Sequence, residues 1–155
     1  MIRIVSGGQT GVDRAALDAA LALGISCGGW CPEGRLAEDG CIPERYPLKE
    51  LAGAGYVERT LMNVMDSDGT LIINFGELQG GTEQTLWFCV EQTKPHELLN
   101  ADKVPVSEAA RLIHAFVKKH RIRILNVAGP RASKEARAYA YALEAIRRFL
   151  VELQT

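Results

Sequence analysis

The chain has 155 residues, of which 47% are hydrophobic and 24% are charged, and its formal net charge is −1. This composition predicts one globular domain over residues 1–155, and the balanced charge argues against a nucleic-acid-binding protein. No apolar stretch approaches the roughly 20 residues of a membrane span, and the N-terminus lacks a signal pattern. We therefore expect a cytoplasmic protein that does not bind membranes.

The first part of the chain alternates predicted strands and helices. Residues 3–6 predict a strand, and small apolar residues at helical spacing predict a helix over residues 12–23. A second strand is expected at residues 25–30. The irregular stretch at residues 31–47 is long for a compact domain, so we interpret it as a candidate lid. Residues 56–66 predict another helix.

The second part begins with the clearest buried strand, at residues 70–75. Its sequence, TLIINF, is nearly continuous in apolar residues, which is typical of a parallel strand covered on both faces. The elements expected after it are a glycine turn at residues 80–82, a helix to about residue 94, a short strand at 95–100, an amphipathic helix from residue 107, a strand at 123–129 and a long helix that closes the chain.

Strands that alternate with helices favour parallel pairing, because each helix returns the chain to the same end of the sheet. We therefore predict an α/β protein with a three-layer, Rossmann-like fold and an open, mainly parallel sheet of about five strands. Ligands of such sheets bind at the carboxyl ends of the strands. Three turns follow predicted strands and should meet there: Gly7-Gly8-Gln9-Thr10-Gly11, Gly80-Gly81-Thr82, and Gly129-Pro130-Arg131-Ala132-Ser133.

Each of these turns is expected to lead into a helix start, where unpaired N–H groups and the helix dipole favour an anion. Gly7 and Gly8 would let the backbone approach a ligand, although a sharp turn alone explains them equally well. Thr10 adds a hydroxyl donor. Arg131 can clasp an oxyanion with two hydrogen bonds, and Ser133 is either a helix cap or a ligand donor.

The first turn, SGGQTG, matches neither common nucleotide motif. It lacks the Gly-Lys-Ser/Thr of a Walker A loop and the spacing of GxGxxG, which disfavours the usual modes of ATP and NAD binding. Trp30 follows the second predicted strand and either stacks on a flat heterocycle or packs in the core. Asp13, Asp39, Glu83 and Asn126 are candidate polar contacts of a ligand, or else caps and loop residues, and Arg14 is a further candidate binding residue.

Cysteine and histidine chemistry is not expected. The four cysteines contain no CxxC pair, so we predict buried or incidental thiols, although Cys27, Cys31 and Cys41 lie in or near the candidate lid. The sequence has no Ser-His-Asp or Cys-His pattern. We expect surface roles for His114 and His120, which fall on the exposed amphipathic helix.

Four strings carry a family resemblance: SGGQTGVDRAALDAA at residues 6–20, GGWCPEGRLAEDGCIPERYPL at 28–48, RTLMNVMDSDGTLI at 59–72 and LNVAGPRASKE at 125–135. Together they resemble the molybdenum carrier family, which is related to the molybdenum cofactor carrier proteins of algae. The resemblance covers nearly the whole chain. More distantly, the pattern resembles the lysine-decarboxylase-like, cytokinin-activating phosphoribohydrolases.

The resemblance implies a homo-oligomeric protein that holds the molybdenum cofactor (molybdopterin) or molybdate, a small anionic ligand, with molybdoenzymes or cofactor-synthesis proteins as partners. It favours a carrier over an enzyme. The binding residues that it implies lie in the three turns: Gly7, Gly8, Gln9, Thr10 and Gly11; Gly80, Gly81 and Thr82; Gly129, Pro130, Arg131 and Ser133.

Two other functions stay open. One is a nucleotide N-glycosidase that acts on nucleoside monophosphates, as in the phosphoribohydrolases, whose PGGxGTxxE string carries a working glutamate. The corresponding stretch here, residues 79–87, has neither the leading proline nor the final glutamate, although Glu83 lies close by. The other is a nucleotide-sensing module that binds without turnover.

Overall fold

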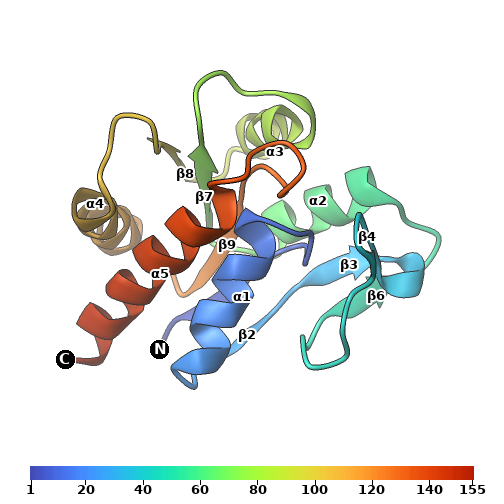
Figure 1. The fold of residues 1–155 in the computed structure, drawn as a ribbon, viewed down its shortest axis with the longest axis horizontal. Helices are drawn as coiled ribbons and strands as arrows, with labels where there is room; N and C mark the ends of the chain where they lie inside the picture. The colour runs from blue at the N-terminus through green and yellow to red at the C-terminus, as the bar shows by residue number, and fades with distance from the viewer.

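The centre of the structure is a five-stranded sheet in which all neighbouring strands are parallel, with the order β2-β1-β9-β7-β8 (Figure 1). The structure is a computed structural model that describes residues 1–155. The strands are β1 (Arg3–Val5), β2 (Cys27–Gly28), β7 (Gly69–Asn74), β8 (His96–Asn100) and β9 (Ile124–Ala128). The helices are α1 (Val12–Ala22), α2 (Tyr56–Met65), α3 (Gly80–Glu91), α4 (Val106–Lys119) and α5 (Ala138–Gln154). The predicted fold class is confirmed.

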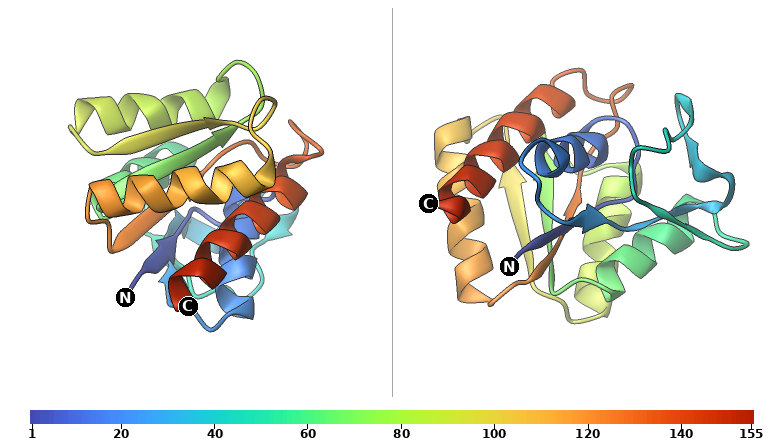
Figure 2. Two further views of the ribbon diagram at one scale, coloured as in Figure 1. Left: turned by 90° about the vertical axis from the view of Figure 1, so that its left-hand side faces the viewer. Right: turned by 90° about the horizontal axis from the view of Figure 1, so that it is seen from below.

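The helices form two different layers (Figures 1 and 2). Helices α1, α4 and α5 pack together on one face of the sheet, while α2 and α3 pack together on the other. The first layer encloses the hydrophobic core, which also includes alternate side chains of the strands and no residue of α2 or α3. The residues of the central strands in that core are Ile4, Cys27, Leu71, Ile73, Leu99, Leu125 and Val127.

The face of the sheet beneath α2 and α3 is partly polar. Successive side chains of a strand point to opposite faces, so Thr70 and Asn74 of β7 point away from the hydrophobic core. Asn126 of β9 lies beside Thr70 in the register of the sheet and shares this face. All three residues are buried. Because buried polar groups are costly without partners, this face is a natural place for a ligand.

The predicted second strand is wrong in its second half. The chain leaves the central sheet at Gly29, whose φ of +128° is rare for other residues. A Cβ at this position would also lie 2.3 Å from the carbonyl oxygen of Ser6. The chain then forms a separate strand, β3 (Trp30–Pro32), which pairs in parallel with the unpredicted strand β6 (Lys49–Leu51).

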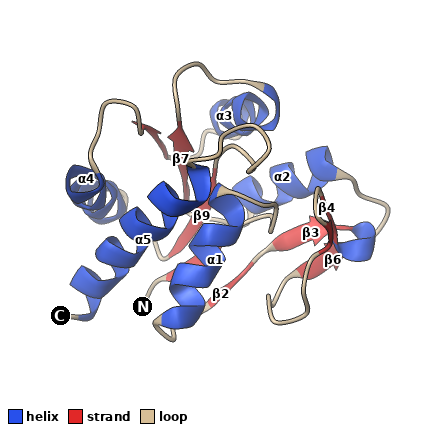
Figure 3. Ribbon diagram, in the orientation of Figure 1, coloured by secondary structure: helices blue, strands red, loops and turns tan.

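The stretch at residues 31–47 is more regular than predicted. It contains a short 3₁₀ helix (Glu33–Arg35) and a hairpin of β4 (Leu36–Ala37) and β5 (Gly40–Cys41), seen at the right of Figure 3. The guanidinium of Arg35 ties this stretch together by donating hydrogen bonds to the carbonyl oxygens of Ile42, Pro43, Tyr46 and Leu48. The sequence pattern did not predict this structure, because the hydrogen bonds from Arg35 to these four carbonyl oxygens form only when the chain has folded.

His114 differs from its expected surface role. Its side chain is half-buried, and its ring packs edge-on against Phe149 of α5 with 6.4 Å between ring centroids. His120 is exposed, as predicted. All four cysteines are free thiols, and Cys41 is the exposed one. Tested for length and hydropathy, every helix falls short of what a bilayer crossing requires.

Candidate functional site

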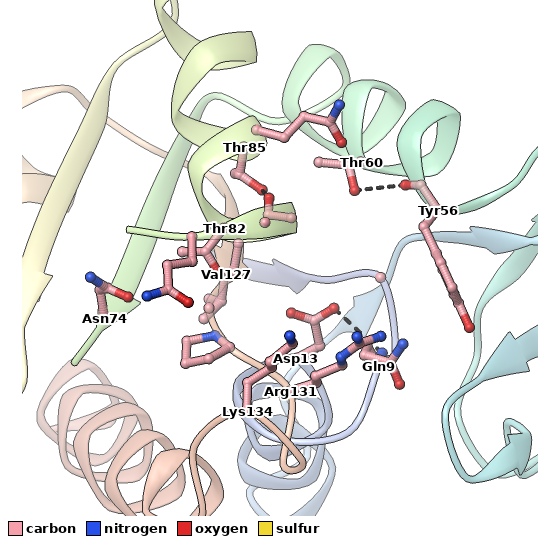
Figure 4. A pocket seen from close by; sticks show the side chains of 18 of the residues that line it. Gln9, Asp13, Tyr56, Thr60, Asn74, Thr82, Thr85, Val127, Arg131 and Lys134 are labelled. Atoms are coloured by element: carbon pink, nitrogen blue, oxygen red, sulfur yellow. Dashed lines mark hydrogen bonds between the residues drawn. The ribbon is translucent and has the colours of Figure 1, made fainter. Parts of the chain in front are cut away.

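A cavity of about 500 Å³ opens at the carboxyl ends of the central strands and runs between the sheet and helices α2 and α3 (Figure 4). This volume is in the range of sites for small organic ligands. Most of the lining is polar. The lining includes Gly7, Gln9 and Asp13; Tyr56, Arg59, Thr60 and Asn63; Asn74, Glu77, Gly80, Gly81, Thr82 and Thr85; and Asn126, Gly129, Pro130, Arg131, Lys134 and Glu135.

The structure brings all three glycine turns to this cavity, but it satisfies their backbone groups differently. The helix start of α1 is partly occupied by the protein itself, because Val12 N–H donates to the Pro130 carbonyl and Gln9 N–H donates to Asp13 Oδ2, whereas Asp13 N–H has no protein acceptor. The third turn does not lead directly into a helix, since α5 begins only at Ala138. The expectation of a free helix start at each turn is therefore wrong for the third turn, and at the first turn the helix start is only partly free.

The second turn offers free backbone donors at the start of a helix. Gly80 and Gly81 form the first turn of α3, and no protein group accepts a hydrogen bond from either N–H. Both residues are exposed and line the cavity. The positive end of the α3 dipole therefore faces the cavity with two unpaired donors, which is the arrangement that favours an anion.

An ion pair crosses the cavity wall between α1 and α2. Nη1 of Arg59 lies 3.2 Å from Oδ2 of Asp13, and both side chains are largely buried. Burial raises the pKa of the Asp13 carboxyl above its ordinary value, against the opposing effect of the Arg59 guanidinium. The Nε of Arg59 is buried without a hydrogen-bond partner. The guanidinium is thus held in place mainly by this pair.

Two glycines are required by close packing around the cavity. A Cβ at Gly7 would lie 1.6 Å from Nη1 of Arg59, so only glycine leaves room for the guanidinium. A Cβ at Gly129 would lie 2.5 Å from the carbonyl oxygen of Ile73 and 2.6 Å from Cγ2 of Val12. Gly129 therefore allows α1 to pack closely against the sheet at the mouth of the cavity.

The side chain of Gln9 has a fixed orientation. Its Oε1 accepts hydrogen bonds from the N–H groups of Thr10 (3.0 Å) and Glu38 (2.8 Å). Two N–H donors require an oxygen at this position, which leaves Nε2 as the other end of the amide. Nε2 has no protein acceptor, and Gln9 lines the cavity while being 7% exposed. Gln9 therefore offers donors to the cavity.

Thr10 and Ser133 lie beside the cavity and bind the carboxylate of Glu38 instead of lining it. The Glu38 carboxylate accepts hydrogen bonds from both hydroxyls and from Ser133 N–H (3.1 Å). Arg131 Nε lies 3.6 Å from the same carboxylate. These contacts lower the pKa of Glu38. The tip of the β4–β5 hairpin is thereby latched onto the first and third turns.

The other predicted site residues that lie outside the cavity have structural partners or open surroundings. Arg14 makes a two-pronged ion pair with Asp39 beside Glu38. Trp30 donates its Nε1–H to Asp66 at 2.7 Å, so its ring does not face the cavity. Glu83 is exposed on α3 outside the lining. Gly8 and Gly11 have φ near +80° and serve the turn itself.

Sequence reasoning missed the contribution of α2, which supplies Tyr56, Arg59, Thr60 and Asn63 to the lining. No motif marks these residues, because their role depends on how α2 crosses the sheet. Asn74 carried a readable signal, since it is a polar residue near the end of the apolar stretch TLIINF. Lys134 was not predicted because it lies one position beyond Ser133, the last residue of the third turn.

The cavity carries charges of both signs. Its cations are Arg59, Arg131 and Lys134, and its acids are Asp13, Glu77 and Glu135. Asp13 is paired with Arg59, and Glu135 is paired with Arg137, which lowers the pKa of Glu135 to about 2. Lys134 has no ion-pair partner. Lys134, next to the third turn, is therefore the cation of the lining whose charge is not balanced by an acidic partner.

A parallel sheet covered by helices on both faces, with a polar cavity at the carboxyl ends of its strands, defines a Rossmann-like α/β protein with a candidate ligand site. Residues 4–150 match the model of the circularly permutated YpsA SLOG family, and the chain belongs to this family. A crystal structure described as a "Putative molybdenum carrier protein" from Syntrophus aciditrophicus SB is similar, with 46% sequence identity and a TM-score of 0.94. The match covers 97% of this chain and 95% of that one. A search of curated proteins gave no match.

Proposed function

We propose that this protein binds a small anionic ligand, molybdate or the molybdenum cofactor, in the cavity and carries it without transforming it. The observation that carries the proposal is the pair of unpaired N–H groups at Gly80 and Gly81, at the positive end of α3. Arg131 and Lys134 line the same cavity and supply cationic donors. The molybdenum assignment is supported by the similarity to the Syntrophus protein described as a molybdenum carrier.

The donor set fits the chemical groups of such a ligand. The phosphate of the cofactor would be held by the N–H groups of the second turn and by Arg131 or Lys134, as anions are held at helix starts. The amides of Gln9 and Asn126 can hydrogen-bond its heterocycle. When bound, the cofactor would supply the redox chemistry of molybdenum to a recipient enzyme.

The lining supports carriage over catalysis. It contains no histidine and no cysteine, and two of its three carboxylates are paired with arginines. Glu83, the acid considered for an N-glycosidase, lies outside the lining. This position argues against the displaced-acid version of that chemistry.

The test is calorimetric titration of the purified protein with sodium molybdate and with an anionic pterin, 6-carboxypterin. We expect saturable binding of at least one of them. The double variant R131A/K134A should weaken that binding about tenfold or more, or about 1.4 kcal/mol. The matched control is Arg111→Ala on α4, which removes an exposed arginine paired only with Glu108. Binding of neither compound, or equal affinity in the double variant, would contradict the proposal.

A further inference from the structure

Three buried residues in the cavity have a side-chain oxygen that lacks a protein donor. These oxygens are Oδ1 of Asp13, Asn74 and Asn126, and these residues are 5%, 6% and 3% exposed, respectively. The hydrogen bonds of all three side chains run through other atoms, either Oδ2 or Nδ2. None of the three oxygens is sealed off from the cavity space, unlike Nε of Arg59. All three are therefore available to a ligand.

In the structure, the nitrogen end of each asparagine amide has a protein partner. Nδ2 of Asn74 donates to the carbonyl of Gly76 at 2.6 Å, and a carbonyl can only accept. Nδ2 of Asn126 donates to the hydroxyl of Thr70 at 3.2 Å. In both residues the oxygen is the end left free. The site thus presents acceptors here, in contrast to the donor that Gln9 presents.

Acceptors of this kind are not satisfied by a bare oxyanion. A deprotonated tetrahedral oxyanion offers only acceptor oxygens, so it cannot pair with the three oxygens itself and places negative charge near Asp13. A buried acceptor without a donor is costly, and water or a ligand that donates removes that cost. A ligand that displaces water from these oxygens therefore needs N–H or O–H groups to replace it.

The spacing of the asparagines adds a size requirement. Asn126 lies beside Thr70 in the sheet, and Asn74 lies four residues further along β7. Four residues of a strand span about 13 Å between Cα atoms. A ligand that reaches both ends of the cavity must therefore be an extended molecule with donors at separate positions.

We infer that the ligand is an organic anion whose N–H or O–H groups donate to Asp13, Asn74 and Asn126, while its anionic group lies by the second and third turns. This inference rests on the proposed function and narrows it. The donors can belong to a pterin or purine ring or to sugar hydroxyls, which share this chemistry.

The first test compares ligands on the wild-type protein by calorimetry. The probes are sodium molybdate, 6-carboxypterin and guanosine 5′-monophosphate. We expect the pterin, the nucleotide or both to bind at least tenfold more tightly than molybdate. If molybdate binds as tightly as either organic probe, and R131A/K134A weakens it, the inference fails while the proposed function stands. If none of the three binds, both fail.

The second test removes the acceptor oxygens. Asn126→Leu and Asn74→Leu should each weaken the organic probe about tenfold and leave molybdate affinity unchanged. Asn126→Asp keeps an acceptor oxygen and should restore most of the affinity lost in Asn126→Leu. Asn100→Ala, at the end of β8 and outside the lining, is the matched control.

Thermal unfolding of each variant checks that it is folded. If Asn126→Leu does not fold, the binding measurements on Asn74→Leu decide the test. Wild-type affinity for the organic probe in the folded leucine variants would overturn the inference. Equal losses for the organic probe and molybdate would overturn it as well.

Discussion

Arg59 of α2 lies directly over Gly7 of the first glycine turn, so closely that no side chain fits at residue 7. The contact places the guanidinium against Asp13 and joins α2 to the mouth of the cavity. A glycine that looks like a simple turn residue therefore positions a cation. Its substitution should affect the ion pair more than the turn.

Gly7→Ala should displace Arg59 and destabilise the protein by about 1–3 kcal/mol, the usual cost of leaving a buried polar group without its partner. Gly129→Ala should cost more, because its Cβ would meet the Ile73 backbone, which cannot rotate away. Gly55→Ala has open space and is the control. Urea unfolding measures all three. A Gly7→Ala protein as stable as the control would show that Arg59 is not constrained as described.

Arg59→Met should destabilise the protein in a pH-dependent manner. Burial raises the pKa of Asp13 above 3.8, so its favourable contribution to folding is complete below that value and is lost as pH rises through the raised pKa. Removing Arg59 raises this pKa further. The cost of Arg59→Met should therefore be smallest below pH 3.8 and reach about 3 kcal/mol at neutral pH. A cost that does not change with pH in urea unfolding would contradict the pairing.

Gly81→Ala should change ligand affinity at the second turn without lowering the stability of the fold. A Cβ at this position meets nothing within 4 Å, and alanine favours helix, so stability should be unchanged or rise by up to about 1 kcal/mol. If a ligand approaches the N–H of Gly81, the added methyl should weaken binding by on the order of 1 kcal/mol. Unchanged affinity in calorimetry would remove the second turn from the site.

Glu38→Ala should release the tip of the β4–β5 hairpin. The Glu38 carboxylate links Thr10, Ser133 and Arg131, and its lowered pKa means that this stabilisation is present above pH 4.5 and is lost as pH falls through the lowered pKa. Limited proteolysis at neutral pH should cut residues 36–41 several times faster in the variant. The control is Glu44→Ala, an exposed glutamate in the same stretch. Equal cleavage rates in the two variants would contradict the latch.

Patterns along the chain were sufficient to predict the central architecture. The helices α1, α4 and α5 carry clear periodicity, because one hydrophobic core selects their side chains, and strand β7 is marked by a nearly continuous apolar run. The prediction of a single strand over residues 25–30 fails at Gly29, because the positive φ of this glycine directs the chain out of the central sheet and into the β3–β6 pair. The spacing of apolar residues indicates which side chains are buried. It does not indicate where the chain leaves one sheet and joins another.

The sequence predicted where the cavity opens, but only some of the residues that line it. Glycine turns after parallel strands point to the correct edge of the sheet, which is a topological consequence. Whether a turn offers free N–H groups depends on distant partners, such as the Pro130 carbonyl that occupies Val12 N–H. Arg59 and Glu38 reach the site from other segments, so no local pattern reveals them.

The central claim, that one ligand is held where the glycine turns meet, is tested most directly by amide chemical shifts. Glycine amides resonate in a separate region of a ¹H–¹⁵N correlation spectrum, so Gly7, Gly81 and Gly129 can be followed individually during titration with 6-carboxypterin and, separately, sodium molybdate. The account predicts that the three signals shift together along one saturation curve with a bound compound. Saturable binding that leaves all three unmoved would contradict it.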